Sequence, residues 1–218
     1  MEDDIYLDSE PIDSTNDPHI ARLPEAQRVN ALRLGLAITY DDMYGWRMWT
    51  PSLATLLWTH LTIPGTRVVG WGIVNYDLVI IRSSTTVHTA PRVLDLSAQI
   101  EAASRRRYKL DIIARTNLGR SKSVDTQTVV GWLRAGDEAS MIKATEHCHS
   151  NVQVVMDLLN MLQRGQPLVL PGRLETDERG WARTREATLR VYFTPEGEWL
   201  RCEDLRGKLV TERGMDQT

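Results

Sequence analysis

The sequence has few cysteines, a single phenylalanine and no long apolar run. Two cysteines in 218 residues cannot build a disulfide framework, so we expect reduced thiols. The absence of an apolar stretch of about eighteen residues predicts that no helix spans a membrane. The first residues, Met1 to Asp4, are acidic where a secretory signal is basic and then apolar. We therefore expect a cytoplasmic protein with no membrane partner.

The composition is that of a soluble globular protein. Hydrophobic residues make up 42% of the chain and charged residues 25%. These fractions allow a sizeable core and exclude a disordered polymer, a collagen-like rod and a coiled coil. The length of 218 residues is between one and two typical domains.

The net charge of −3 conceals a separation of charge along the chain. Residues 1–30 are acidic, whereas the segment 105–122 is strongly basic. Its basic residues are Arg105, Arg106, Arg107, Lys109, Arg115, Arg120 and Lys122, and its one acid is Asp111. Such a segment could hold a phosphate backbone, or it could be a solvated helix face.

Hydrophobic spacing predicts mixed helices and strands. Residues 31–40 alternate with period two, which predicts a strand, and Trp46 to Trp49 can return as its hairpin partner. Residues 11–28 are expected to form a long loop. A helix is expected behind Pro51, with Leu53, Leu56, Leu57 and Leu61 on one face.

The next segments predict a buried strand at 68–71, a short helix at 78–81 and a further helix opening at 93–96. From 108 to 163 we expect three or four helices, broken at Gly119, at Gly136 and near Ser150. A short strand is expected at 168–170.

The composition changes after Pro171. We expect a first domain at 1–171 and, at 172–218, a small β-hairpin appendage that ends in a frayed tail. The tryptophans Trp181 and Trp199 are expected to be exposed there. The order of elements indicates an α/β fold with mixed strand directions.

Three acidic residues are expected to lie close together at one edge of the sheet. Asp8 and Glu10 are two residues apart on an expected strand, so their carboxylates point to the same side. Close carboxylates resist ionisation without a cation, which suggests Mg²⁺ or Mn²⁺. Asp77 follows an apolar strand and can reach the same edge. The alternatives are an exposed strand end for the pair and a helix N-cap for Asp77.

His147 and Asn151 are four residues apart and share one helix face. A histidine beside a metal site could orient or deprotonate a water molecule. The run Glu146, His147, Cys148 and His149 is not expected to bind zinc, because consecutive helical side chains diverge by about 100°.

Four blocks occur in a familiar order: Asp8-Ser9-Glu10, 69–77, 118–123 and 146–152. Together they resemble the DEDD-type 3′–5′ exonucleases of the ribonuclease-H-like superfamily, in particular a prokaryotic branch found beside or fused to helicases. The resemblance covers residues 4–170. It implies a ribonuclease-H-like mixed sheet flanked by helices.

The resemblance also implies a site. Asp8, Glu10 and Asp77 would take three of four acidic positions that hold two Mg²⁺ or Mn²⁺ ions, and Asn151 would take the fourth as a neutral ligand. His147 would stand where the family has tyrosine and would act on the attacking water. The six residues expected to contact nucleic acid are Arg105, Arg106, Arg107, Lys109, Arg120 and Lys122.

Two functions follow from this resemblance. The first is a metal-dependent 3′–5′ exonuclease acting on single-stranded DNA or RNA ends, impaired by Asn151. The second is a catalytically inactive nuclease-fold subunit that binds nucleic acid or docks with a helicase or another processing protein. A third interpretation is an α/β domain whose acids are merely on the surface.

Overall fold

The computed structural model describes residues 3–87, 89–120, 124–176, 182–193, 200–204, 207 and 209–211. The chain divides into two compact units. The first comprises Met1–Leu96 with Ser123–Val155, and the second comprises Ser97–Lys122 with Met156–Thr218. Residues of the long helix α8 (Glu138–Gln163) belong to both units.

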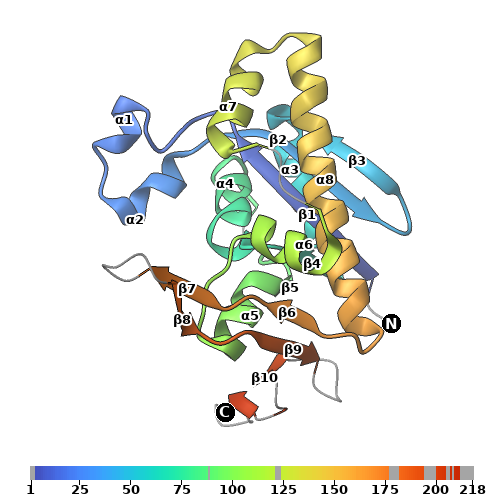
Figure 1. Cartoon of the computed structure of the whole chain (residues 1–218). Helices are drawn as coiled ribbons and strands as arrows, with labels where there is room; N and C mark the ends of the chain where they lie inside the picture. The colour runs from blue at the N-terminus through green and yellow to red at the C-terminus, as the bar shows by residue number, and fades with distance from the viewer. Residues whose placement is uncertain are drawn as a thin grey trace. The chain divides into compact units, whose positions relative to one another are not determined.

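The first unit is built on a five-stranded mixed sheet (Figure 1). Its strands are β1 (Asp3–Pro11), β2 (Leu34–Asp41), β3 (Gly45–Trp49), β4 (Thr66–Gly70) and β5 (Val93–Asp95). Their order is β3-β2-β1-β4-β5. Strands β1, β4 and β5 are parallel, whereas β2 is antiparallel to both β1 and β3. This order with these directions is that of the ribonuclease-H-like fold, which confirms the predicted fold class.

Helices and short helical turns accompany this sheet. They are α1 (Pro18–Ala21), α2 (Glu25–Arg28), η1 (Val29–Ala31), η2 (Pro51–Leu53), α3 (Ala54–Leu61), η3 (Ile73–Asn75), α4 (Asp77–Ser83), α7 (Thr126–Ala135) and the first part of α8.

The apolar core lies on one face of the sheet. Because side chains alternate along a strand, Ile5 and Leu7 of β1 share a face, and both are buried with Val68 of β4. Leu57 of α3 and Ile81 of α4 are fully buried in the same cluster. The other face of β1 therefore carries Asp8 and Glu10, away from this core.

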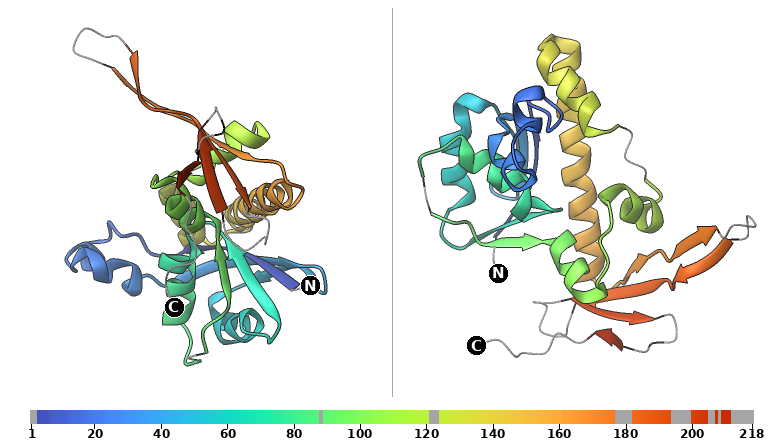
Figure 2. Two further views of the ribbon diagram at one scale, coloured as in Figure 1. Left: turned by 90° about the horizontal axis from the view of Figure 1, so that it is seen from below. Right: turned by 90° about the vertical axis from the view of Figure 1, so that its left-hand side faces the viewer.

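The second unit combines helices with antiparallel strands. Its helices are α5 (Leu96–Ser104), α6 (Leu110–Leu118) and the end of α8. One sheet has the order β11-β10-β9-β6, and β7 and β8 form a separate hairpin (Figure 2). The strands are β6 (Leu168–Leu170), β7 (Arg173–Thr176), β8 (Ala182–Glu186), β9 (Leu189–Phe193), β10 (Leu200–Asp204) and β11 (Leu209–Thr211). The expected C-terminal β-hairpin appendage is thus present.

A side chain substitutes for a strand at the edge of that sheet. Asn117 of α6 donates from Nδ2 to the Val169 carbonyl over 3.0 Å and accepts the Val169 N–H at Oδ1 over 2.6 Å. The amide therefore pairs with both backbone groups of one residue of β6, which otherwise face outward at a sheet edge.

Tertiary packing overturns four local predictions. Residues 11–28 contain the short helices α1 and α2 rather than only a loop. Leu53 and Leu56 are exposed, because the turn η2 shifts the helical phase and buries Ala54 instead. Residues 93–95 form β5, since parallel pairing with β4 stabilises a strand too short to be recognised locally.

The fourth correction concerns Ser150. Helix α8 is continuous through this position, as the right-hand view of Figure 2 shows. Serine is exposed there and is tolerated in a helix whose buried face packs well. The breaks at Gly119 and Gly136 are confirmed, because both glycines end a helix at positive φ.

Some predictions lie outside these findings. The division at residue 171 stays a prediction, although the compact units divide elsewhere. Lys122, Trp181, Trp199 and the tail from Glu212 lie outside the described residues. Within the described part of the chain, no helix has the length and apolar character needed to cross a membrane.

Candidate active site

Asp77 is bound to β1 at the point where β4 ends. The pairing of β1 with β4 reaches Tyr6 and Val69, so the later residues of β1 extend beyond the neighbouring strand. There, Asp77 Oδ1 accepts the Ser9 N–H over 2.7 Å and the Ser9 hydroxyl over 2.9 Å. The carboxylate thus replaces a strand as the partner of this backbone N–H. Asp77 is the first residue of α4, and Tyr76 occupies the N-cap position.

A hydrogen-bonded chain connects the remaining predicted residues. Asn151 Nδ2 donates to Asp8 Oδ1 and Oδ2, over 3.3 and 3.2 Å. The same nitrogen lies 3.2 Å from His147 Nε2, which lies 3.3 Å from Glu10 Oε1. The structure therefore brings Asp8, Glu10, His147 and Asn151 together, from β1 and α8.

Three of these four side chains are buried: Glu10, His147 and Asn151 are each less than a tenth exposed. Asp8 is partly buried. Asp77, on the neighbouring helix, is also buried. The alternative interpretation, in which these acids lie at an exposed strand end, is therefore wrong.

The electrostatics of the cluster favour an added positive charge. Burial raises the pKa of Asp77 to about 7, and the nearby Glu10 charge adds to this rise, although the Ser9 hydrogen bonds oppose it. Glu10 Oε2 is buried without a hydrogen-bond partner. Burial, Asp8 and Glu10 also raise the pKa of the neighbouring Cys148 thiol well above its usual value. Cys148 therefore stays protonated and adds no charge to the site.

The donor chemistry fits a hard divalent ion. Carboxylate and amide oxygens are the ligands that Mg²⁺ and Mn²⁺ prefer, and the unpartnered Glu10 Oε2 marks an uncompensated buried acceptor. Across the described residues, no three His, Cys, Asp or Glu side chains already surround a point that could hold a metal ion. The fit thus rests on donor type and charge, not on a preformed cage.

The turn that delivers Asp77 has its own support. Asp95, at the end of β5, accepts the N–H groups of Gly72 and Val74 over 2.8 and 3.1 Å. Gly70 precedes the turn, and a Cβ there would lie 2.3 Å from Ile73 Cγ2 and 3.0 Å from the Leu7 carbonyl oxygen. Only glycine permits this close approach of β4 to η3.

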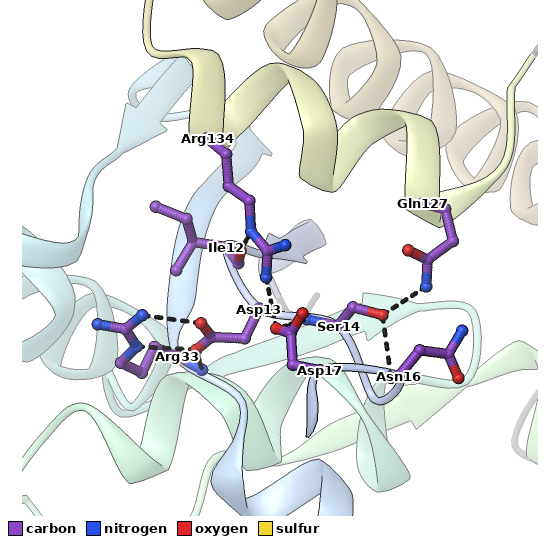
Figure 3. Close-up of polar contacts among 8 residues, drawn as sticks. All are labelled: Ile12, Asp13, Ser14, Asn16, Asp17, Arg33, Gln127 and Arg134. Atoms are coloured by element: carbon purple, nitrogen blue, oxygen red, sulfur yellow. Dashed lines mark hydrogen bonds and ion pairs between the residues drawn. The ribbon is translucent and has the colours of Figure 1, made fainter. Parts of the chain in front are cut away.

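A polar network holds the loop that follows Glu10, and Figure 3 shows its contacts. Asp13 forms a two-bond ion pair with Arg33, at 2.7 and 2.8 Å. Arg134 of α7 donates to the Ile12 carbonyl and contacts Asp17. Arg134 of α7 and Arg33, the residue before β2, therefore both hold this loop and with it the end of β1 that carries Glu10.

Sequence reasoning missed these supporting residues. Ser9, Asp95 and Arg134 act through partners 21 to 122 positions away in the chain. No spacing rule connects residues at such separations. For Ser9 one signal was available, since it lies between two of the predicted acids.

The described residues of the basic segment 105–122 belong to the second unit. Arg107 pairs with Glu101 at 3.0 Å, Arg120 pairs with Asp157 at 2.5 Å, and Arg106 donates to the Ala187 carbonyl. Arg106, Arg107 and Arg120, which were predicted to contact nucleic acid, therefore each have a partner inside the same unit.

Arg105 and Lys109 are exposed. Arg105 has a φ of 58°, the one positive φ of a non-glycine residue in the described chain. An arginine costs about 1 kcal/mol in this left-handed conformation, which Arg105 adopts where α5 ends and its N–H donates to the Glu101 carbonyl over 2.7 Å.

Comparisons with known proteins find a similarity in structure but none in sequence. No family model matches the chain, and no curated protein matches its sequence. One similar solved structure is that of exonuclease I, at 13% identity and a TM-score of 0.37. The match covers 95% of this chain and 56% of the exonuclease I chain, so this protein spans little more than half that length. The fold assignment rests on strand order and direction, not on this similarity.

Proposed function

We propose that this protein is a divalent-metal-dependent 3′–5′ exonuclease-like phosphodiester hydrolase in which Asn151 weakens metal binding. The observation that carries the proposal is the gathering of Asp8, Glu10, His147 and Asn151 into one hydrogen-bonded chain, beside the buried Asp77. Single-stranded DNA or RNA ends are the proposed substrates.

The metal ligands in this proposal are Asp8, Glu10 and Asp77, with Asn151 as a neutral contributor. Mg²⁺ or Mn²⁺ held by these residues would supply activation of a water and charge stabilisation for the departing 3′ oxygen. Asn151 reduces the negative charge of the ligand set by one relative to a fourth carboxylate. We therefore expect weaker binding of at least one of two ions.

His147 is the proposed proton acceptor for the attacking water. An unprotonated Nε2 accepts from Asn151, and a protonated Nε2 donates to Glu10 Oε1. The ring nitrogen thus has a partner in either state, which suits a group that takes up and releases a proton.

One observation favours the second function, a binding subunit without catalysis. The Asn151 amide presents its N–H donors to Asp8, and so supplies positive polarity where a metal ligand would supply an oxygen. In that case the chain binds nucleic acid through residues such as Arg105 and Lys109. Docking with a helicase stays a prediction.

A cleavage assay separates the two functions. We would use 3′- and 5′-labelled single- and double-stranded DNA and RNA with Mg²⁺ or Mn²⁺, comparing the natural protein with Asp8→Ala and Asn151→Asp. Stepwise loss from the 3′ end, abolished by a chelator and absent in Asp8→Ala, supports the exonuclease. Activity only in Asn151→Asp supports the binding subunit. Absence of cleavage by all three proteins overturns the exonuclease proposal.

A further inference from the structure

Ser9 lies between two predicted metal ligands but contacts the third. Along β1 its side chain points to the opposite face from Asp8 and Glu10. It is buried, and both its backbone N–H and its hydroxyl donate to Asp77 Oδ1. The partners are 68 positions apart in the chain, so the contact joins β1 to the start of α4.

Two donors on one oxygen fix the orientation of a carboxylate. Hydrogen bonds to an ionised acceptor are shorter and stronger than neutral ones, and the two distances here are 2.7 and 2.9 Å. They hold Oδ1 against β1 and leave Oδ2 outside both bonds. Without them, a buried carboxylate near Glu10 would have little reason to stay in this orientation.

The hydroxyl and the backbone N–H play different parts. The N–H remains with any residue except proline at position 9, whereas the hydroxyl depends on serine or threonine. Alanine at position 9 therefore removes one donor while keeping the strand, the pairing of Ser9 with Ala37 and the backbone contact.

We propose that Ser9 is a positioning residue that holds Asp77 ready to bind a divalent ion. The inference rests on the proposed function, since it takes Asp77 as a metal ligand. Ser9 contacts neither metal nor substrate in this role. It acts by fixing one oxygen of Asp77, so that ion binding does not have to order the side chain.

Manganese binding provides a direct readout that does not require cleavage. We would titrate Mn²⁺ into the natural protein, Ser9→Ala, Ser9→Thr and Asp77→Ala, following free Mn²⁺ by electron paramagnetic resonance. Ser83→Ala is the matched control. It removes a hydroxyl from helix α4, which also carries Asp77, but the Ser83 hydroxyl donates to backbone carbonyls and not to a carboxylate. Thermal unfolding checks that each variant is folded.

Loss of a residue that orients a metal ligand typically weakens affinity by about 10- to 100-fold. We expect such a loss in Ser9→Ala, recovery in Ser9→Thr and no change in Ser83→Ala. In a cleavage assay, the kcat of Ser9→Ala should fall while the KM for nucleic acid stays unchanged.

Three results would overturn the inference. Natural affinity in Ser9→Ala removes the role of the hydroxyl while leaving the proposed function intact. An equal loss in Ser83→Ala shows general loosening of α4. If the natural protein binds no more Mn²⁺ than Asp77→Ala does, the metal-dependent function itself is overturned, and this inference with it.

Discussion

At the scale of single residues, we propose that Asn151 sets the balance between a metal-free and a metal-bound site. Its Nδ2 lies within hydrogen-bonding distance of Asp8 and His147, so it satisfies acceptors that a cation would otherwise neutralise. An aspartate in its place adds a ligand charge but brings a like charge against Asp8.

Asn151→Asp should therefore change the site in opposite directions with and without metal. We expect Mn²⁺ affinity to rise by about tenfold or more, because affinity follows ligand charge. In chelator, the free energy of unfolding should fall by about 1–3 kcal/mol, because a donor is replaced by a charge. Calorimetric Mn²⁺ titration and urea unfolding measure the two effects. Unchanged affinity would contradict the assignment of residue 151 to the metal site.

Asp77 predicts a pH dependence of stability. Its pKa is raised from 3.8 to about 7 in the folded protein, mainly by burial, so the folded state binds more protons than the unfolded state between these values. In chelator, the free energy of unfolding should therefore fall as the pH rises from about 4 to about 7. Urea unfolding across this range should give a flatter profile for Asp77→Asn. If the free energy of unfolding depends on pH in the same way in both proteins, the Asp77 carboxyl does not have a raised pKa.

At the scale of elements, the approach of α7 to β2 depends on Gly35. A Cβ at this position would lie 2.8 Å from Leu133 Cδ1, 2.9 Å from the Ile12 nitrogen and 3.1 Å from the Glu10 carbonyl oxygen. Two of these atoms are backbone and cannot move aside without displacing the end of β1.

Gly35→Ala should therefore destabilise the protein by about 1–3 kcal/mol through overpacking. The matched control is Gly131→Ala on α7, where a Cβ would meet no atom within 4 Å. That change should stabilise the helix by about 0.5–1 kcal/mol, because alanine is the better helix former. Urea unfolding of both variants tests the pair, and equal effects would refute the packing argument.

At the scale of the whole molecule, a net charge of −3 makes any nucleic-acid binding a local property. Arg105 and Lys109 are exposed in the basic segment, and Arg105 keeps a positive φ. Both side chains belong to the set predicted to contact nucleic acid, so we expect their charges to act on binding rather than on folding.

Arg105→Gly should weaken binding of a single-stranded oligonucleotide without loss of stability, since glycine accepts a positive φ readily. The slope of log affinity against log salt should become shallower by about 0.7 for each lost phosphate contact. Arg164→Ala removes an equal exposed charge from the same unit and serves as control. Equal slopes for Arg105→Gly and the natural protein, measured by fluorescence anisotropy, would exclude Arg105 from the binding surface.

The sequence alone determined the features that depend on local periodicity and residue chemistry. Alternation identified β2, the glycines at 119 and 136 ended their helices, and the spacing of Asp8 and Glu10 placed both on one strand face. These rules work because each depends on neighbours within a few residues. The α/β class with mixed strand directions followed from the order of such elements, and the ribonuclease-H-like assignment followed from the resemblance of the four sequence blocks.

Only the tertiary structure decided which side chains of the site contact one another. Parallel pairing with β4 made residues 93–95 a strand, and packing kept α8 continuous past Ser150. The same folding directed the Asn151 amide toward Asp8 and gave Asp77 its two donors from Ser9. These contacts join residues 68 and 143 positions apart, and hydrogen-bond energy depends on distance in space rather than along the chain.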